Sequence, residues 1–184
     1  MKSKKMKAFK RLVWAKADIA AARDLTEILL TNLKILHENL AYRAIETGIV
    51  VSYARPFGEN DNLGTLPNEF RQFDDAGAQI AHDGILRARD IQEAHNNLRE
   101  RGSLIQAPFT AEEAINVEVE IKEDGRTFWE VRPPSLAVGQ IERMLKLFRI
   151  QEDRLEKEIQ SSFALLLREH PKMPGIYKLG VDFP

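Results

Sequence analysis

The chain has 184 residues, of which 43% are hydrophobic and 30% are charged, and its 27 basic and 28 acidic side chains leave a formal charge of −1. This composition excludes a disordered chain, and the balanced charge excludes long-range attraction of the whole molecule to nucleic acid or anionic lipid. The absence of cysteine excludes disulfides, thiolate-bound zinc and cysteine catalysis. We therefore expect a single folded domain over 1–184, and we place it in the cytoplasm by default.

The amino terminus is rich in basic side chains, which crowd into a short stretch: Lys2, Lys4, Lys5, Lys7, Lys10 and Arg11. We interpret residues 1–16 as a solvated basic N-terminal arm, with an arm that contacts phosphate as the alternative. Charged residues between 16 and 24 interrupt the apolar region that a signal peptide would need. No run approaches the ~20 apolar residues of a spanning helix, so we expect no membrane contact.

Apolar residues recur at helical spacing from Asp18 to Ala54. The pattern fits two helices, or one long helix with a break near 37–39, and neither proline nor a glycine cluster decides between them. Pro56 ends the second segment, because proline disfavours helix at the preceding residue and has no amide hydrogen to donate. The stretch 57–64 is dense in glycine, asparagine and aspartate, which is typical of a surface loop.

A central helix is predicted over about 73–98, with its apolar side formed by Ile80, Ile85, Leu86 and Ile91. From Ile115 to Ile121 apolar and acidic residues alternate, which is typical of a strand with one covered face. Asp124 and Gly125 then provide a tight turn, and a second strand follows, so we predict a β-hairpin over 115–131.

The last predicted helix follows a pair of prolines, begins near Ser135 as a candidate cap, and stops before Pro171. Residues 172–184 form a C-terminal tail. The fold class predicted from these elements is mainly α, a helical bundle of four to five helices with one inserted β-hairpin. Trp14 and Trp129 are interpreted as packing residues rather than as platforms for stacking bases.

Motifs that hold phosphate, metal or a serine nucleophile do not occur: there is no glycine-rich phosphate loop, no GxSxG and no HExxH. We therefore expect no cofactor and no metal. The histidines are at 37, 82, 95 and 170. Among these, His95 has the most informative surroundings, because Arg89 and Asp90 precede it within the predicted helix.

The spacing of these residues on a helix sets a geometric condition. At ~100° per residue, Arg89 and His95 lie about 120° apart, whereas His82 and Arg89 share nearly one face. Bringing Arg89 to His95 therefore requires its long side chain, a local bend, or a second copy of the helix across a dimer axis.

If Arg89 and His95 meet, they supply what RNA cleavage without a metal requires. A histidine of ordinary pKa can take or give a proton at neutral pH, and a guanidinium can hold the charge that develops on a phosphoryl group. His95 would then act as acid or base, Arg89 would stabilise the pentacovalent phosphorus, and Asp90 would orient one of them. The alternative is that these side chains are the solvated side of an amphipathic helix, with Glu93 pairing with Arg89.

The stretch from His82 through Leu86 and Arg89-Asp90 to Ala94-His95-Asn96 resembles the signature of the HEPN superfamily, in which a helix carries arginine, a polar residue, a few variable positions and then histidine. The segment from Tyr53 to Phe57, followed by a variable loop, also resembles members of that superfamily. The similarity covers about half of the chain.

This resemblance implies a helical bundle that commonly forms a homodimer, in which two motif helices meet at a composite RNA-cutting site. Arg89, Asp90 and His95 match the motif and would be its catalytic residues. His82 and Arg55 match only the surrounding pattern, which implies a weaker role in substrate binding.

Members of the superfamily often belong to toxin–antitoxin or phage-defence systems, so the implied partners are RNA and an antitoxin or another protein. The function expected on these grounds is a metal-independent endoribonuclease. Because other members have lost activity, the alternative is a non-catalytic helical module for protein binding or dimerisation.

Overall fold

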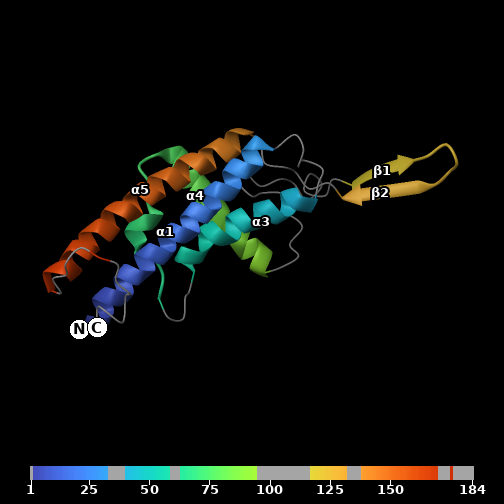
Figure 1. Cartoon of the computed structure of the whole chain (residues 1–184). Helices are drawn as coiled ribbons and strands as arrows, with labels where there is room; N and C mark the ends of the chain where they lie inside the picture. Colours follow the sequence, from blue (N-terminus) through green and yellow to red (C-terminus); the bar gives the residue numbers. More distant parts are fainter. Residues whose placement is uncertain are drawn as a thin grey trace.

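A computed structural model describes residues 2–32, 40–58, 63–94, 117–131 and 138–169, together with residue 175. Its described part contains four α-helices, which are α1 (Lys2–Thr31), α3 (Leu40–Ala54), α4 (Ala76–Ala94) and α5 (Val138–Glu169) (Figure 1). Two short 3-10 helices, η1 (Arg55–Phe57) and η2 (Asn68–Arg71), lie between α3 and α4. The prediction of a mainly helical fold is confirmed.

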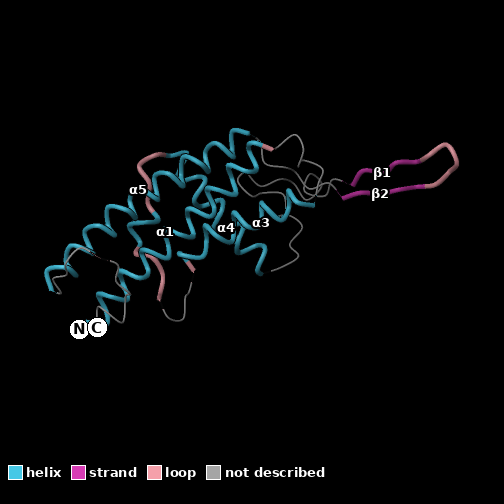
Figure 2. The backbone as a smooth tube through the Cα atoms, viewed as in Figure 1, coloured by secondary structure: helices cyan, strands magenta, loops and turns pink. Residues whose placement is uncertain are grey.

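The helices pack as a bundle in which α1 contacts α3 and α5, and α4 contacts the same two helices (Figures 1 and 2). Ion pairs fix the direction of α1 against α5: Arg23 Nη1 lies 2.7 Å from Glu152, and Glu27 pairs with Arg149 at 3.5 Å. Positions further along α1 thus meet earlier positions of α5, so the two helices are antiparallel.

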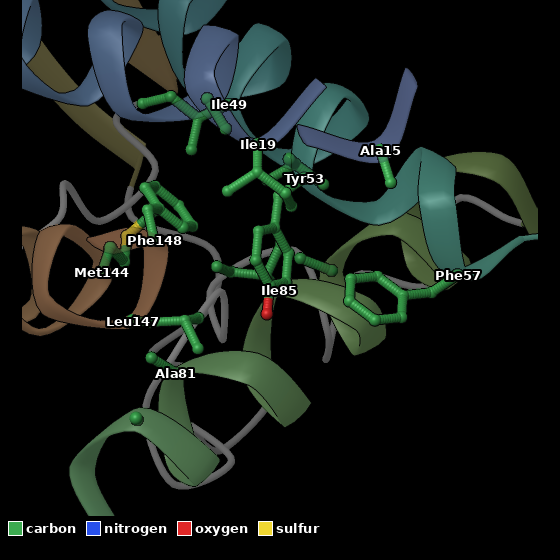
Figure 3. Packing of buried hydrophobic residues seen from close by; sticks show 14 of the residues in the cluster. Ala15, Ile19, Ile49, Tyr53, Phe57, Ala81, Ile85, Met144, Leu147 and Phe148 are labelled. Atoms are coloured by element: carbon green, nitrogen blue, oxygen red, sulfur yellow. The ribbon is translucent and has the colours of Figure 1, made fainter. Parts of the chain in front are cut away.

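The core lies between the four helices and is formed by large apolar side chains from each of them. In Figure 3 the ring of Tyr53 stands at the centre, among Ile19 of α1, Ile85 of α4 and Phe148 of α5. All four side chains are fully buried. The centroids of the Tyr53 and Phe148 rings are 5.0 Å apart. Burial of such side chains contributes roughly 1.5–3 kcal/mol each, so this cluster positions α3 and α4 relative to each other.

The amino-terminal segment differs from the prediction. Residues 2–16 are the first half of α1 and not an arm, and Phe9, Leu12 and Ala15 on it are buried. The lysines at 4, 5 and 7 are exposed as expected. The sequence signal was dominated by these lysines, but apolar residues spaced by three place one side of the same segment on the bundle.

Two further residues expected to pack are exposed instead. Trp14 of α1 is 63% exposed, and Ile80 of α4 is 51% exposed. The inner side of α4 is built largely from alanines, with Ile85 and His82 between them. Small side chains let α4 approach its neighbours closely, and the buried stripe is therefore rotated away from Ile80.

Strands β1 (Val117–Ile121) and β2 (Thr127–Val131) pair antiparallel, with Val119 opposite Trp129. Gly125 in the connecting turn has a φ of 80°, a conformation that glycine adopts without strain. Figure 1 draws this pair apart from the helices.

The possible break near 37–39, His95, and most of the tail 172–184 lie outside the described residues. Within the described part, no helix is both long enough and apolar enough to cross a membrane.

Candidate functional site

The described part of the motif helix α4 lies against a corner of the fold formed by residues 53–58, which we call the α3–η1 corner. Pro56 stands in the first turn of η1, where its missing amide hydrogen costs nothing, and it ends α3 as predicted. Pro56 and Phe57 are buried, so the corner is fixed by packing. Two residues of the motif region, His82 and Arg89, contact it.

His82 lies inside the core beneath this corner. Only 1% of its surface is exposed, and its Nδ1 lies 2.7 Å from the hydroxyl of Tyr53. The rings of Phe57 and Phe73 flank the imidazole, with centroids 4.9 and 5.2 Å away. The structure therefore gives His82 a packing role, and the expected direct contact with a substrate is not supported by its position.

Burial controls the protonation of this pair. Removal from water lowers the pKa of His82 to about 4, opposed by nearby Asp83 and assisted by the charges of Arg71 and Arg154. Burial likewise raises the pKa of Tyr53 well above its ordinary value. At neutral pH both groups are uncharged and share one hydrogen bond between the Tyr53 hydroxyl and Nδ1 of His82, and the imidazole tautomer sets which of the two donates.

Arg89 lies at the edge of the same corner, with its side chain 25% exposed. Its Nε and Nη2 atoms donate to Oδ1 of Asp90 at 3.0 and 2.5 Å. On the other side of the guanidinium is Gly58, where a Cβ atom would come within 2.8 Å of Nη1. Gly58 therefore makes room for Arg89, and Asp90 orients its guanidinium.

Two more arginines surround the corner. Arg71 donates to the carbonyl oxygen of Phe57 at 2.5 Å, and its guanidinium lies 5.4 Å from the centre of the Phe57 ring. Arg55 is exposed and pairs with Asp18 of α1 at 2.6 Å. Burial raises the pKa of Asp18, although the adjacent Arg55 works against that shift. The ion pair neutralises much of the charge that Arg55 could offer to a phosphate.

The structure thus brings Arg89, Asp90, Arg55 and His82 to one corner, in two layers. Arg89 and Arg55 lie at the surface, and His82 lies below them. His95, the predicted acid or base, lies outside the described residues, as do the side chains of 91–94. No group of three or more histidine, aspartate or glutamate side chains in the described part could hold a metal ion.

Sequence reasoning missed the partners that hold these residues. The Tyr53–His82 hydrogen bond joins residues 29 positions apart, and Gly58 was interpreted only as a loop former. The sequence signal available for these contacts was the segment from Tyr53 to Phe57. Its resemblance to the superfamily did not assign it a physical role. In the structure this segment supplies buried residues of the corner, and Gly58, which follows it, makes room for the Arg89 guanidinium.

A separate open pocket of about 510 Å³ lies between η2, the residues that precede α4, and α5. Its arginine, Arg154, donates to the main-chain oxygens of Glu69 and Gln72 and stacks on Phe73 at 5.2 Å. The other charged residues that line it are acidic. An acidic pocket whose cation is already engaged is poorly suited to a phosphate, so the α3–η1 corner remains the better candidate.

Comparisons of this chain with protein-family models, with curated proteins and with solved structures gave no match.

Proposed function

We propose that this protein is a metal-independent endoribonuclease of the HEPN type, which acts as a homodimer. In this proposal His95 is the general acid or base, Arg89 binds the phosphate and stabilises the transition state, and Asp90 orients Arg89. One observation carries the assignment of Arg89: its guanidinium is held at a surface corner between Asp90 and Gly58, so its position is set before any substrate arrives.

The reaction proceeds by internal attack on phosphorus. His95 of one copy takes the proton of a ribose 2′-hydroxyl, and the 2′-oxygen bonds to the adjacent phosphorus. The bond to the 5′-oxygen breaks, and that oxygen receives a proton from His95 of the second copy. The products are a 2′,3′-cyclic phosphate and a 5′-hydroxyl. Arg89 holds the negative charge on the pentacovalent phosphorus, while the buried pair of His82 and Tyr53 keeps the corner in place.

In its cellular role the protein would belong to a toxin–antitoxin or phage-defence system, with an antitoxin or another protein as partner. We propose that the hairpin over 115–131 is an insertion into the helical bundle that provides a surface for such a partner. Its turn is exposed and carries an ion pair between Arg126 and Asp124 at 2.6 Å, so the tip is polar.

A second candidate function is a non-catalytic helical module that uses the same region to bind a protein. One observation favours it: Asp90 already compensates the charge of Arg89, which weakens the attraction of this surface for RNA. The two candidates differ in whether Arg89 and His95 are needed for chemistry or only for contact.

The deciding experiment is an RNA-cleavage assay with excess chelator on the wild type, Arg89→Ala and His95→Ala at equal concentrations of folded protein. Arg87→Ala is the matched control, because Arg87 is exposed on the outer side of the same helix. We expect losses of ~10²–10³-fold for Arg89→Ala and ~10²–10⁴-fold for His95→Ala, with Arg87→Ala near the wild type. Mass analysis of the RNA ends should find cyclic phosphate and 5′-hydroxyl.

Equal inactivity of all four proteins on several RNAs would reject the nuclease. The test would then move to protein binding, comparing capture of a genetically linked protein by the wild type and by Arg89→Ala.

A further inference from the structure

The amino-terminal half of α1 carries many basic side chains and no acidic one. Between residues 2 and 17 there is neither aspartate nor glutamate, and the basic residues are Lys2, Lys4, Lys5, Lys7, Lys10, Arg11 and Lys16. Because this segment is a helix and not an arm, the helix fixes the relative positions of these charges. Positive charge is therefore in local excess here, although the whole chain has a formal charge of −1.

Three of these cations and a tryptophan form one stripe along the helix. The four residues follow each other at spacings of three and four, so at ~100° per residue they lie within about 80° of each other. Lys4 and Lys7 are exposed, Arg11 is half-buried, and Trp14 is 63% exposed. We call Lys4, Lys7, Arg11 and Trp14 the α1 basic stripe.

The cations of the α1 basic stripe are not neutralised within the described part of the chain. None of the ion pairs there includes Lys4, Lys7 or Arg11. The Nε atom of Arg11 is buried without a hydrogen-bond partner. An incoming anion therefore displaces no carboxylate here, whereas Arg55 and Arg89 at the corner already pair with aspartates.

The α1 basic stripe leads toward the α3–η1 corner. The next position on the same side of α1 is Asp18, which pairs with Arg55 of the corner. A Cβ atom at Gly64, in the segment that follows the corner, would lie 3.7 Å from Nη1 of Arg11. Lys4 and Asp18 lie about 21 Å apart along the helix axis. At ~3.4 Å per stacked nucleotide, this length corresponds to about six nucleotides.

We infer that the α1 basic stripe binds a single strand of RNA, with the backbone along the cations and a base stacked on Trp14. The chemistry of the stripe selects this ligand, because cations contact phosphates and an exposed indole offers a base a flat apolar partner. In a duplex each base is covered by its neighbours, so stacking on Trp14 requires a single strand. The use of this strand as a substrate rests on the proposed cleavage, whereas its binding does not.

An anionic membrane is the other surface that a basic helix can meet, and the fold argues against it. A helix that lies on a membrane inserts its apolar side among the lipids. Here that side is occupied, because Phe9, Leu12 and Ala15 are buried in the bundle. The ring of Phe9 also stacks on Phe163 of α5, with centroids 5.6 Å apart. The stripe itself offers one large apolar side chain, Trp14, which suits a base better than a lipid layer.

Fluorescence anisotropy of a dye-labelled 2′-O-methyl oligouridylate of ~12 nucleotides measures this binding. The probe lacks a free 2′-hydroxyl, so the proposed cleavage cannot consume it. Titrations of the full chain at several salt concentrations around ~0.15 M give the affinity and its salt dependence. Lys4→Ala, Lys7→Ala and Trp14→Ala each remove part of the stripe. Lys157→Ala is the matched control, because Lys157 is exposed on α5 and is not part of the stripe.

We expect the wild type to bind the probe and each of the two lysine variants to bind it at least ~3-fold more weakly, with a slope of log affinity against log salt smaller by about 0.7. Trp14→Ala should weaken binding at least ~5-fold and leave the slope unchanged, because stacking releases no counterion. Lys157→Ala should match the wild type. Circular dichroism checks that each variant is folded.

Binding that all three stripe variants leave unchanged, or that Lys157→Ala weakens equally, would overturn the inference. So would equal affinity for the probe paired with oligoadenylate, or binding to phosphatidylserine vesicles without binding to the oligonucleotide. Cleavage of unmodified RNA is measured separately. Binding at the stripe without cleavage would reject the proposed nuclease alone, and cleavage without binding at the stripe would reject this inference alone.

Discussion

Replacing His82 with glutamine should remove a large part of the pH dependence of stability. The pKa of His82 in the folded protein is lowered to about 4, from 6.5, so folding favours the neutral imidazole. Its contribution is complete above pH 6.5 and is lost as the pH falls toward 4. For these two pKa values the linkage relation gives a loss of about 2.5 kcal/mol in the free energy of unfolding between pH 7 and pH 4.5.

Urea denaturation of the wild type and His82→Gln at pH 7, 6, 5 and 4.5 would measure this loss. Glutamine does not titrate, so the difference in unfolding free energy between the two proteins should shrink by about 2.5 kcal/mol over that range. Every other titrating group is common to both proteins and cancels. A difference that stays constant with pH would show that His82 titrates normally, and would refute the buried Tyr53–His82 pair.

Three further changes probe the same corner and the core. Tyr53→Phe should cost about 1–2 kcal/mol at pH 7, because the buried Nδ1 of His82 loses its hydrogen-bond partner; a urea midpoint equal to that of the wild type would contradict this. Burial raises the pKa of Glu46 to about 6, so its protonated form stabilises the fold at low pH and this contribution is lost as the pH rises through 6. Glu46→Gln should therefore be about 2 kcal/mol more stable than the wild type at pH 8 and equal to it at pH 4. If the variant were instead more stable than the wild type only at pH 4, the pKa of Glu46 would not be raised by burial. Gly58→Ala should change stability by less than about 0.5 kcal/mol, because its φ of −84° suits alanine and the obstructing Nη1 can move, yet it should lower RNA cleavage at least ~10-fold by displacing Arg89. If Gly58→Ala cleaves RNA at the wild-type rate, cleavage does not depend on the observed position of Arg89.

Most helices could be predicted from the sequence because their signals are local. Proline at 56 and the apolar spacing of α5 depend on residues within a few turns of each other. The prediction of an amino-terminal arm was wrong because the basic composition of the segment was given more weight than the spacing of Phe9, Leu12 and Ala15. Residues distant in the chain also determine which side of α4 is buried. The alanines of α4 join the core only because α3 and α5 pack over them.

The sequence by itself determined the helical class of the protein, the end of α3 at a proline, and the nearly common face of His82 and Arg89, because each depends on local periodicity. Only the tertiary structure decided that His82 is buried against Tyr53 while Arg89 lies at the surface beside Gly58. The physical reason is that burial and protonation depend on which helices meet, and contacts between residues far apart in the chain leave no periodic signal in it.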